Sequence, residues 1–171
     1  MIALDIETEL DDYGNYTRNL TVASTAETFG GALRQYSPAS VYELIDRLPY
    51  YDRILGYNLV SFDLPVLSLY SGWARPLNDI CKTFDLYQEI VRLTGRRDIS
   101  LDDLARGTLG AALPQHGGRL ASLGQTRRLY QHSANGVIEI NAIYRFGLAN
   151  RFLRWMGPLG QLYETTVDWA M

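Results

Sequence analysis

Residues 2–8 read Ile-Ala-Leu-Asp-Ile-Glu-Thr, and this stretch governs how the rest of the chain is interpreted. The apolar start predicts a short buried strand near the N-terminus. Because side chains on a strand alternate between its two faces, Asp5 and Glu7 share one face, and Leu4 and Ile6 share the other. Two like charges at the end of a buried strand are costly unless a cation or a proton neutralises them. The stretch therefore predicts a metal site, although two solvated loop acids would give the same short pattern.

The composition is that of an ordinary globular protein. The chain has 171 residues, of which 47% are hydrophobic and 20% are charged, enough for one domain with a real core. No apolar run has transmembrane length, and no basic segment precedes an apolar one at the N-terminus, so we expect neither a membrane span nor a signal peptide. The single cysteine, Cys81, excludes an internal disulfide and favours a reducing, cytoplasmic location. No Cys/His cluster suggests zinc.

Charge is unevenly distributed along the chain. Residues 1–91 carry 13 acids and 6 bases, whereas residues 92–171 carry 6 acids and 10 arginines. All but one of the 16 basic residues are arginine, whose planar guanidinium binds phosphate through two parallel hydrogen bonds. The basic half therefore suggests a phosphate-facing surface, and solvated helix faces explain it equally well.

The order of the expected elements indicates a single α/β domain. Strands are predicted at residues 1–7, 19–25, 28–36, 53–57 and 80–84. Helices are predicted after Ser37-Pro38, after Ser61, near 85–94, after Ser100 and over 126–149. A loop with His116 is predicted over 107–118, and a terminal hairpin is predicted from residues 151–156 and 161–169. The Asn135-Gly136 pair predicts an interruption of the last helix. Strands that alternate with helices after an antiparallel meander are typical of α/β folds.

Residues 56–63, Gly-Tyr-Asn-Leu-Val-Ser-Phe-Asp, form the second informative segment. A predicted strand ends at Asn58 and a helix begins near Phe62. Asp63 then lies in the first helical turn, where the helix dipole favours a carboxylate. Taken alone, Asp63 is explained as an ordinary N-terminal helix acid.

Taken together, Asp-x-Glu-Thr on a first strand and Asn-x3-Phe-Asp after a later strand resemble the DEDD superfamily of metal-dependent 3′–5′ exonucleases, which have the ribonuclease H-like fold. Residues 83–86, 99–106, 108–110 and 143–147 look like its predicted helicase-associated exonuclease subgroup. The resemblance covers residues 1–150. It implies a mixed five-stranded sheet, an antiparallel meander followed by parallel strands, flanked by helices. Residues 151–171 would then be a hairpin extension of the same domain.

The resemblance also implies the chemistry of the site. Asp5, Glu7 and Asp63 would hold two divalent ions, Mg²⁺ or Mn²⁺, for hydrolysis of a phosphodiester at a nucleic-acid 3′ end. The substrate-binding candidates are Thr8, Tyr57, Asn58 and Phe62. Core packing accounts equally well for the two aromatic ones. A single-stranded 3′ end is the expected substrate, and a helicase or polymerase is the expected partner.

The fourth acid of this superfamily is absent in the best register. Alignment on residues 144–147 puts Gly136 in its position, and His132 four residues earlier, where some members keep a tyrosine. Three explanations stay open: Gly136 replaces an aspartate, naturally or by an introduced change; Glu139 or Asn135 substitutes for it; or the Asn-Gly pair shifts the register. His132 is a candidate general base, because imidazole titrates near neutrality, and a packing histidine explains it equally well.

Three functional hypotheses follow. The first is a metal-dependent 3′–5′ exonuclease in which Gly136 weakens one metal site and lowers the rate. The second is a nucleic-acid-binding module that keeps the fold without turnover, and the third is an interaction domain with vestigial acids. The missing acid favours the second and third hypotheses, whereas retention of the other three acids together with Asn58 favours the first.

Overall fold

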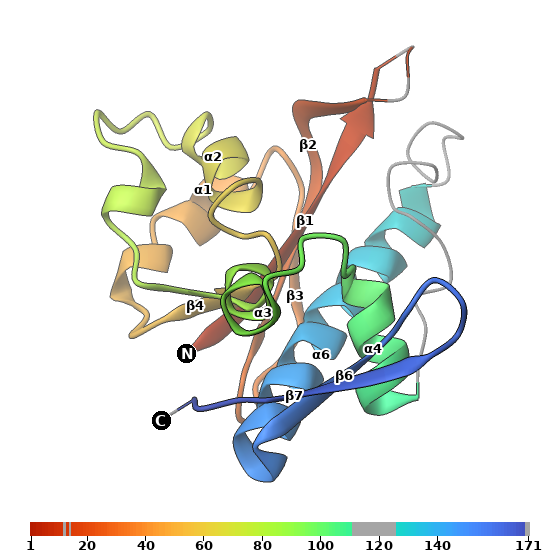
Figure 1. Cartoon of the computed structure of the whole chain (residues 1–171). Helices are drawn as coiled ribbons and strands as arrows, with labels where there is room; N and C mark the ends of the chain where they lie inside the picture. The colour runs from red at the N-terminus through yellow and green to blue at the C-terminus, as the bar shows by residue number, and fades with distance from the viewer. Residues whose placement is uncertain (12, 14, 111–125, 170–171) are drawn as a thin grey trace.

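The computed structural model describes residues 1–11, 13, 15–110 and 126–169. A five-stranded sheet in the order β3-β2-β1-β4-β5 carries helices on both faces, and a separate two-stranded hairpin follows it (Figure 1). The strands are β1 (Ile2–Leu10), β2 (Tyr16–Glu27), β3 (Arg34–Tyr36), β4 (Ile54–Gly56), β5 (Thr83–Asp85), β6 (Phe152–Met156) and β7 (Leu162–Thr166). The helices are α1 (Val41–Ile45), α2 (Asp63–Ser68), α3 (Leu86–Thr94), α4 (Leu101–Leu109) and α6 (Thr126–Asn150), with short 3-10 helices η1 (Leu48–Tyr50) and η2 (Leu77–Asp79).

The sheet is mixed, as predicted. β1, β2 and β3 form an antiparallel meander, while β4 is parallel to both β1 and β5. β3 is shorter than the strand predicted at residues 28–36 and begins at Arg34. Residues 28–30 form a turn instead, in which Gly30 has φ of 109°, a backbone angle that glycine adopts without steric cost.

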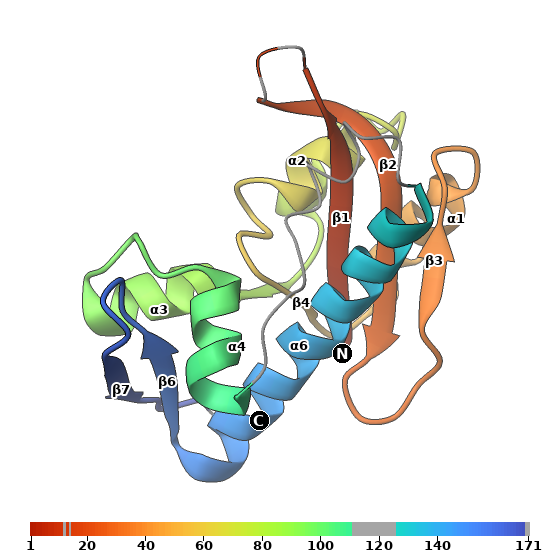
Figure 2. The same cartoon turned by 90° about the vertical axis from the view of Figure 1, so that its right-hand side faces the viewer.

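The two faces of the sheet belong to two different hydrophobic cores (Figure 2). Ile2, Leu4 and Ile6 of β1 pack in the core that α1 and α2 cover. Ala3 faces the other core, to which α3, α4, α6 and the hairpin contribute. The alternation predicted for residues 2–8 is therefore confirmed, and it turns Asp5 toward α6.

The longest helix, α6, runs unbroken through Asn135-Gly136, so the predicted interruption is wrong. Its inward-facing Leu129, Val137 and Ile140 are fully buried. A glycine in a helix interior costs about 0.5–1 kcal/mol relative to alanine. Burial of even one such side chain contributes about 1.5–3 kcal/mol, so packing on the sheet outweighs the local signal.

One predicted helix start is wrong and two are confirmed. α1 begins at Val41 rather than after Ser37-Pro38. α2 begins at Asp63, next to the predicted Phe62, although Phe62 rather than Ser61 is its N-cap. The capping box at Ser100 is present, since Ser100 Oγ accepts from the Asp103 N–H and the Asp103 carboxylate accepts from the Ser100 N–H. Of the loop predicted at residues 107–118, residues 107–109 belong to α4, and residues 111–118 with His116 lie outside the described residues.

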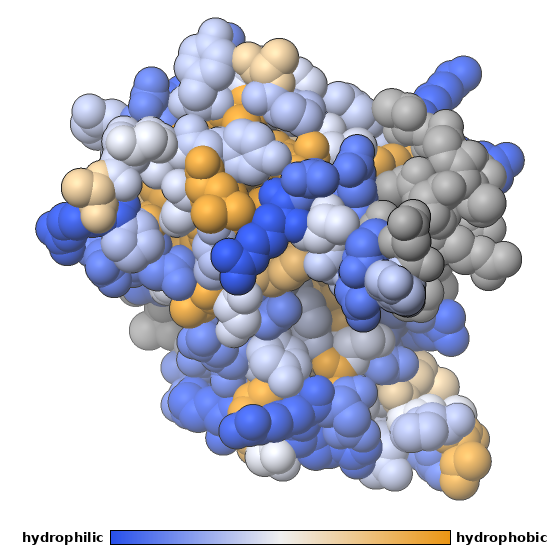
Figure 3. Space-filling view, turned by 90° about the horizontal axis from the view of Figure 1, so that it is seen from above, coloured by the Kyte–Doolittle hydropathy of each residue, from blue (hydrophilic) through white to orange (hydrophobic). Residues whose placement is uncertain are grey.

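Within the described ranges, no helix is long and apolar enough to span a bilayer. Figure 3 shows the face at the top of Figure 1, where hydrophobic side chains lie as separate small areas among hydrophilic ones.

Candidate functional site

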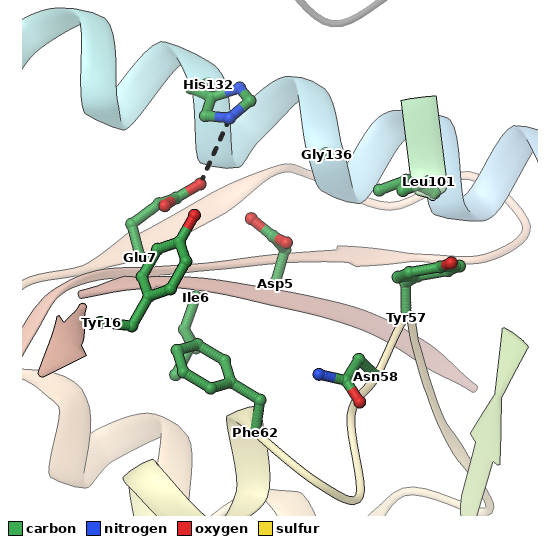
Figure 4. A pocket seen from close by; sticks show the side chains of 10 residues that line it. All are labelled: Asp5, Ile6, Glu7, Tyr16, Tyr57, Asn58, Phe62, Leu101, His132 and Gly136. Atoms are coloured by element: carbon green, nitrogen blue, oxygen red, sulfur yellow. Dashed lines mark ion pairs between the residues drawn. The ribbon is translucent and has the colours of Figure 1, made fainter. Parts of the chain in front are cut away.

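A pocket of about 290 Å³ opens where β1, the turn between β4 and α2, and α6 meet (Figure 4). We refer to it as the acid pocket. Its lining residues are Asp5, Ile6, Glu7, Tyr16, Tyr57, Asn58, Phe62, Leu101, His132 and Gly136. The structure therefore brings together most of the residues singled out from the sequence, although they come from three distant parts of the chain.

Asp63 lies behind this lining, at the edge of β1. β4 pairs only with Ile2 and Ala3 of β1, so it leaves the rest of that edge uncovered. The buried Asp63 carboxylate takes the vacant place, and its Oδ1 accepts a hydrogen bond of 3.1 Å from the Ile6 N–H. The first turn of α2 thus fixes a third carboxylate beside Asp5.

Thr8, like Asp63, is a predicted site residue that does not line the acid pocket. Its side chain is fully buried, and its hydroxyl has no hydrogen-bond partner among the described residues. Its substrate-binding role stays a prediction that its position does not support.

The three carboxylates resist ionisation. Burial raises the pKa of Asp5 to about 7, with a hydrogen bond from Ser133 opposing the rise and the charge of Glu139 adding to it. Burial and then the charge of Asp5 raise the pKa of Glu7 to about 9. Burial, followed by Asp5, raises the pKa of Asp63 well above its usual range. Full ionisation of this group calls for a compensating cation.

α6 contributes His132 and Gly136 to the opposite wall. His132 Nε2 lies 3.6 Å from Glu7 Oε1, within ion-pair range for a protonated imidazole (Figure 4). A Cβ added at Gly136 would lie 3.1 Å from both Cγ and Oδ2 of Asp5. The helix backbone therefore passes directly over Asp5, and a carboxylate at position 136 would face it.

The two candidate substitutes for the fourth acid lie outside the lining. Neither Glu139 nor Asn135 lines the acid pocket. Glu139 is nevertheless close enough for its charge to raise the pKa of Asp5, and its Oε2 is buried without a hydrogen-bond partner in the described part of the chain.

A polar network fixes the rotation of α6 on the sheet. Ser133 Oγ donates to Ser24 Oγ at 2.8 Å. Gln35 Nε2 donates to the same Ser24 oxygen at 3.0 Å and to the Tyr130 carbonyl at 2.7 Å. These bonds connect β2, β3 and α6, so His132 and Gly136 keep their positions over β1.

Asp85 holds the turn after β4, a role that the sequence analysis did not assign to it. Asn58 has φ of 58°, a left-handed conformation that is costly for a residue with a side chain. The Asp85 carboxylate accepts the N–H groups of Asn58 (2.9 Å), Val60 (3.0 Å) and Tyr87 (3.0 Å). With the turn held, the Asn58 amide points into the acid pocket (Figure 4). The position of Asp85 between a strand and a helix was the available sequence signal, since it is typical of an N-cap.

Tyr16 is a further lining residue that sequence reasoning missed. Its ring lies 5.7 Å from the Phe62 ring at 72°, an edge-to-face pair at the pocket wall. Tyr16 reaches this place because it pairs with Leu10 after two register shifts between β1 and β2. No local sequence signal specifies those shifts.

The donors of the site suit a hard divalent cation. Carboxylate oxygens are the ligands that Mg²⁺ and Mn²⁺ prefer, and a bound cation reverses the cost of buried negative charge. Among the residues that the structure describes, no three His, Cys, Asp or Glu side chains already form a group that could hold an ion. The acids therefore fit such an ion by chemistry and charge, and their side chains would have to close around it.

The chain matches no family model and no curated protein. Among solved structures, it is similar to the crystal structure of Trypanosoma brucei RNase D, with a TM-score of 0.62 at 14% sequence identity. The match covers 88% of this chain but 58% of the trypanosomal chain, so this chain spans little more than half of that protein. The similarity shows the ribonuclease H-like fold that the sequence predicted. The helicase-associated subgroup stays a prediction.

Proposed function

We propose that this domain is exonuclease-like, binds a nucleic-acid 3′ end in the acid pocket and hydrolyses its terminal phosphodiester with divalent metal. The observation that carries the proposal is the convergence of Asp5, Glu7 and Asp63 on the middle of β1, where burial leaves them in need of a cation. The fold shared with a protein named RNase D supports the same class of function.

The side chains divide the work by chemistry and position. Asp5, Glu7 and Asp63 would hold Mg²⁺ or Mn²⁺, and two such ions would stabilise the attacking and leaving oxygens of the phosphodiester. The Asn58 amide, which points into the acid pocket, would donate a hydrogen bond to a phosphate oxygen. His132, beside Glu7, is the candidate to accept a proton from the attacking water.

Gly136 limits this activity. The site has three carboxylates at the positions where the superfamily has four, and the fourth position is filled by helix backbone. We therefore propose that one of the two ions binds weakly and that hydrolysis is slow.

Calorimetric titration with Mn²⁺ tests the metal site. The parent should release or take up heat at millimolar Mn²⁺, and Asp5→Asn should reduce the affinity sharply. If the unsubstituted protein does not bind Mn²⁺ at millimolar concentration, the proposal that it is an enzyme is wrong. Shortening of 5′-labelled single-stranded DNA and RNA from the 3′ end, with Asp5→Asn as the control, then tests turnover and separates the two substrates.

The second candidate function is a nucleic-acid-binding module without turnover. The glycine at position 136 favours it, because the helix position that faces Asp5 carries no carboxylate. This candidate predicts binding of single strands that weakens steeply with salt, since phosphate contacts release counterions, and no shortening of the strand in Mn²⁺. The helicase or polymerase partner and the cytoplasmic location stay predictions.

A further inference from the structure

A second hollow adjoins the acid pocket and shares Tyr57 and Asn58 with it. We refer to it as the tyrosine groove. Its volume is about 350 Å³, and its other lining residues are Tyr87, Arg97, Asp98, Ile99 and Ser100. Because Tyr57 and Asn58 line both hollows, a polymer that continued from the acid pocket past Tyr57 would meet the tyrosine groove.

The aromatic walls of the groove are fixed in place. The Tyr57 hydroxyl donates to the Ile99 carbonyl, and the Tyr87 hydroxyl donates to the Arg97 carbonyl at 3.3 Å. Both rings are thereby tied to the same segment, and they lie 5.7 Å apart at 68°. Rings that are already ordered lose little conformational entropy when a flat ligand packs against them.

The charge of the groove favours an anion at Arg97. Arg96 binds Asp98 through two contacts, of 3.0 and 2.6 Å, so that acid is neutralised within the segment. Arg97 is exposed, and its guanidinium has no ion-pair partner among the described residues. An unpaired guanidinium beside two tyrosine rings is a suitable contact for a nucleotide, whose base stacks and whose phosphate is anionic.

We propose that the tyrosine groove binds the second nucleotide from the 3′ end of a single-stranded nucleic acid. Its base packs on the tyrosine rings and its phosphate contacts Arg97. The inference rests on the proposed function, which places the terminal nucleotide in the acid pocket. Both hollows lie near the lower end of ligand-site volumes, roughly 300–1,000 Å³, which suits one nucleotide each. Any base can stack on an aromatic ring. The groove would therefore favour strands of at least two nucleotides and would not select among bases.

The test compares a 5′-phosphorylated mononucleotide with the corresponding dinucleotide. Calorimetry on the whole chain, with Ca²⁺ in place of Mn²⁺ to slow hydrolysis, gives the ratio of their affinities. The parent should bind the dinucleotide at least tenfold more tightly. Tyr87→Ala should lower this ratio by about fivefold or more, as expected for the loss of one stacked base, down to a limit of about 1 at which the second nucleotide contributes nothing. Tyr87→Phe keeps the ring and should retain most of the ratio.

Two arginine variants separate the phosphate contact from general charge. Arg97→Gln should lower the ratio and reduce the slope of log affinity against log salt by about 0.7, the value for one phosphate contact in a single strand. Arg47→Gln removes the same charge next to α1, which covers the other face of the sheet, and should keep the parent ratio.

The outcomes distinguish the groove from the function on which it rests. A parent that binds the mononucleotide but gains nothing from the second nucleotide overturns the groove and leaves the proposed function standing. The same holds if Tyr87→Ala and Arg97→Gln both keep the parent ratio. A parent that binds neither ligand at millimolar concentration overturns both proposals.

Discussion

Gly136 is the residue at which α6 passes over Asp5, and a side chain there must share space with the Asp5 carboxylate. An added Cβ at 3.1 Å obliges that carboxylate to move by a few tenths of an ångström, which a side-chain terminus can do. Gly136→Asp also adds a like charge to a desolvated site. Without metal, we expect Gly136→Asp to have a lower melting temperature than Gly136→Ala, which adds the same Cβ without charge. We expect Mn²⁺ to raise the melting temperature of Gly136→Asp more than that of the unsubstituted protein.

The same substitution should raise hydrolysis of single-stranded DNA in Mn²⁺, because it restores a fourth oxygen ligand opposite Asp5. A 3′-shortening assay on parent, Gly136→Asp and Gly136→Ala measures this. An aspartate variant as inactive as the parent would show that the register, or the resemblance behind it, is wrong.

The raised pKa values of Asp5 and Glu7 make the stability of the metal-free protein pH-dependent. Both carboxyls keep their protons in the folded chain up to about pH 7 and pH 9, whereas unfolded carboxyls lose them near pH 4. The contribution of these two groups to stability is therefore greatest below about pH 4 and is lost as the pH rises from there to these values. We expect the melting temperature to drop between pH 5 and pH 9 without metal, and Glu7→Gln to reduce the drop. An equal drop in this variant would contradict the assignment to Glu7.

At the scale of single residues, the sequence predicted the contacts that depend on local geometry. Asp5 and Glu7 share a face because strand alternation is local. Asp63 was grouped with them only through the family resemblance, because its bond to the Ile6 N–H at the free edge of β1 depends on how distant segments pack. Tyr16 was not predictable in this way, because its place depends on register shifts across the hairpin. The fourth carboxylate could not be assigned either, since the direction of Glu139 depends on how α6 docks.

At the scale of elements, the turn between β4 and α2 depends on a carboxylate from the next strand and helix. Asp85 is buried and binds three backbone N–H groups, including that of the left-handed Asn58. Asp85→Ala leaves these donors unsatisfied, and we expect a loss of about 3 kcal/mol or more in the free energy of unfolding by urea. The exposed Asp79→Ala should change it by less than about 0.5 kcal/mol. Similar losses of unfolding free energy in both variants would mean that the hydrogen bonds of Asp85 contribute little to stability.

In some elements, tertiary packing rather than the local sequence decides where a helix starts or ends. Asn135-Gly136 is a local signal for a break, yet the apolar face of α6 continues on both sides of it and is buried against the sheet. The capping box at Ser100 was predictable because it is closed within four residues. The start of α1 was not, because Ser37 and Ser40 bond to each other and shift the first turn.

At the scale of the whole molecule, the segment that follows β7 packs into the core between the sheet, α3 and α6. Trp169 is buried, stacks on Tyr144 at 5.6 Å and 18°, and meets Phe84 of β5 edge-to-face at 5.1 Å. Its Nε1 donates to Glu89 of α3 at 3.2 Å. The sheet, α3 and α6 thus meet on the Trp169 side chain. That residues 151–171 extend the same domain stays a prediction.

If residues 151–171 belong to the same domain as the sheet, their loss must weaken the entire fold. Trp169→Ala should lower the free energy of unfolding by about 3–5 kcal/mol, the usual cost of truncating a buried aromatic side chain. Leu162→Ala, at a half-exposed position of β7, should cost far less. Urea unfolding followed by far-ultraviolet circular dichroism and by tryptophan fluorescence should give coincident single transitions for the parent, because one cooperative unit loses all its structure together. Removal of residues 151–171 should abolish that transition. A fragment of residues 1–150 that unfolds at the parent's urea midpoint would show that the hairpin is an independent unit.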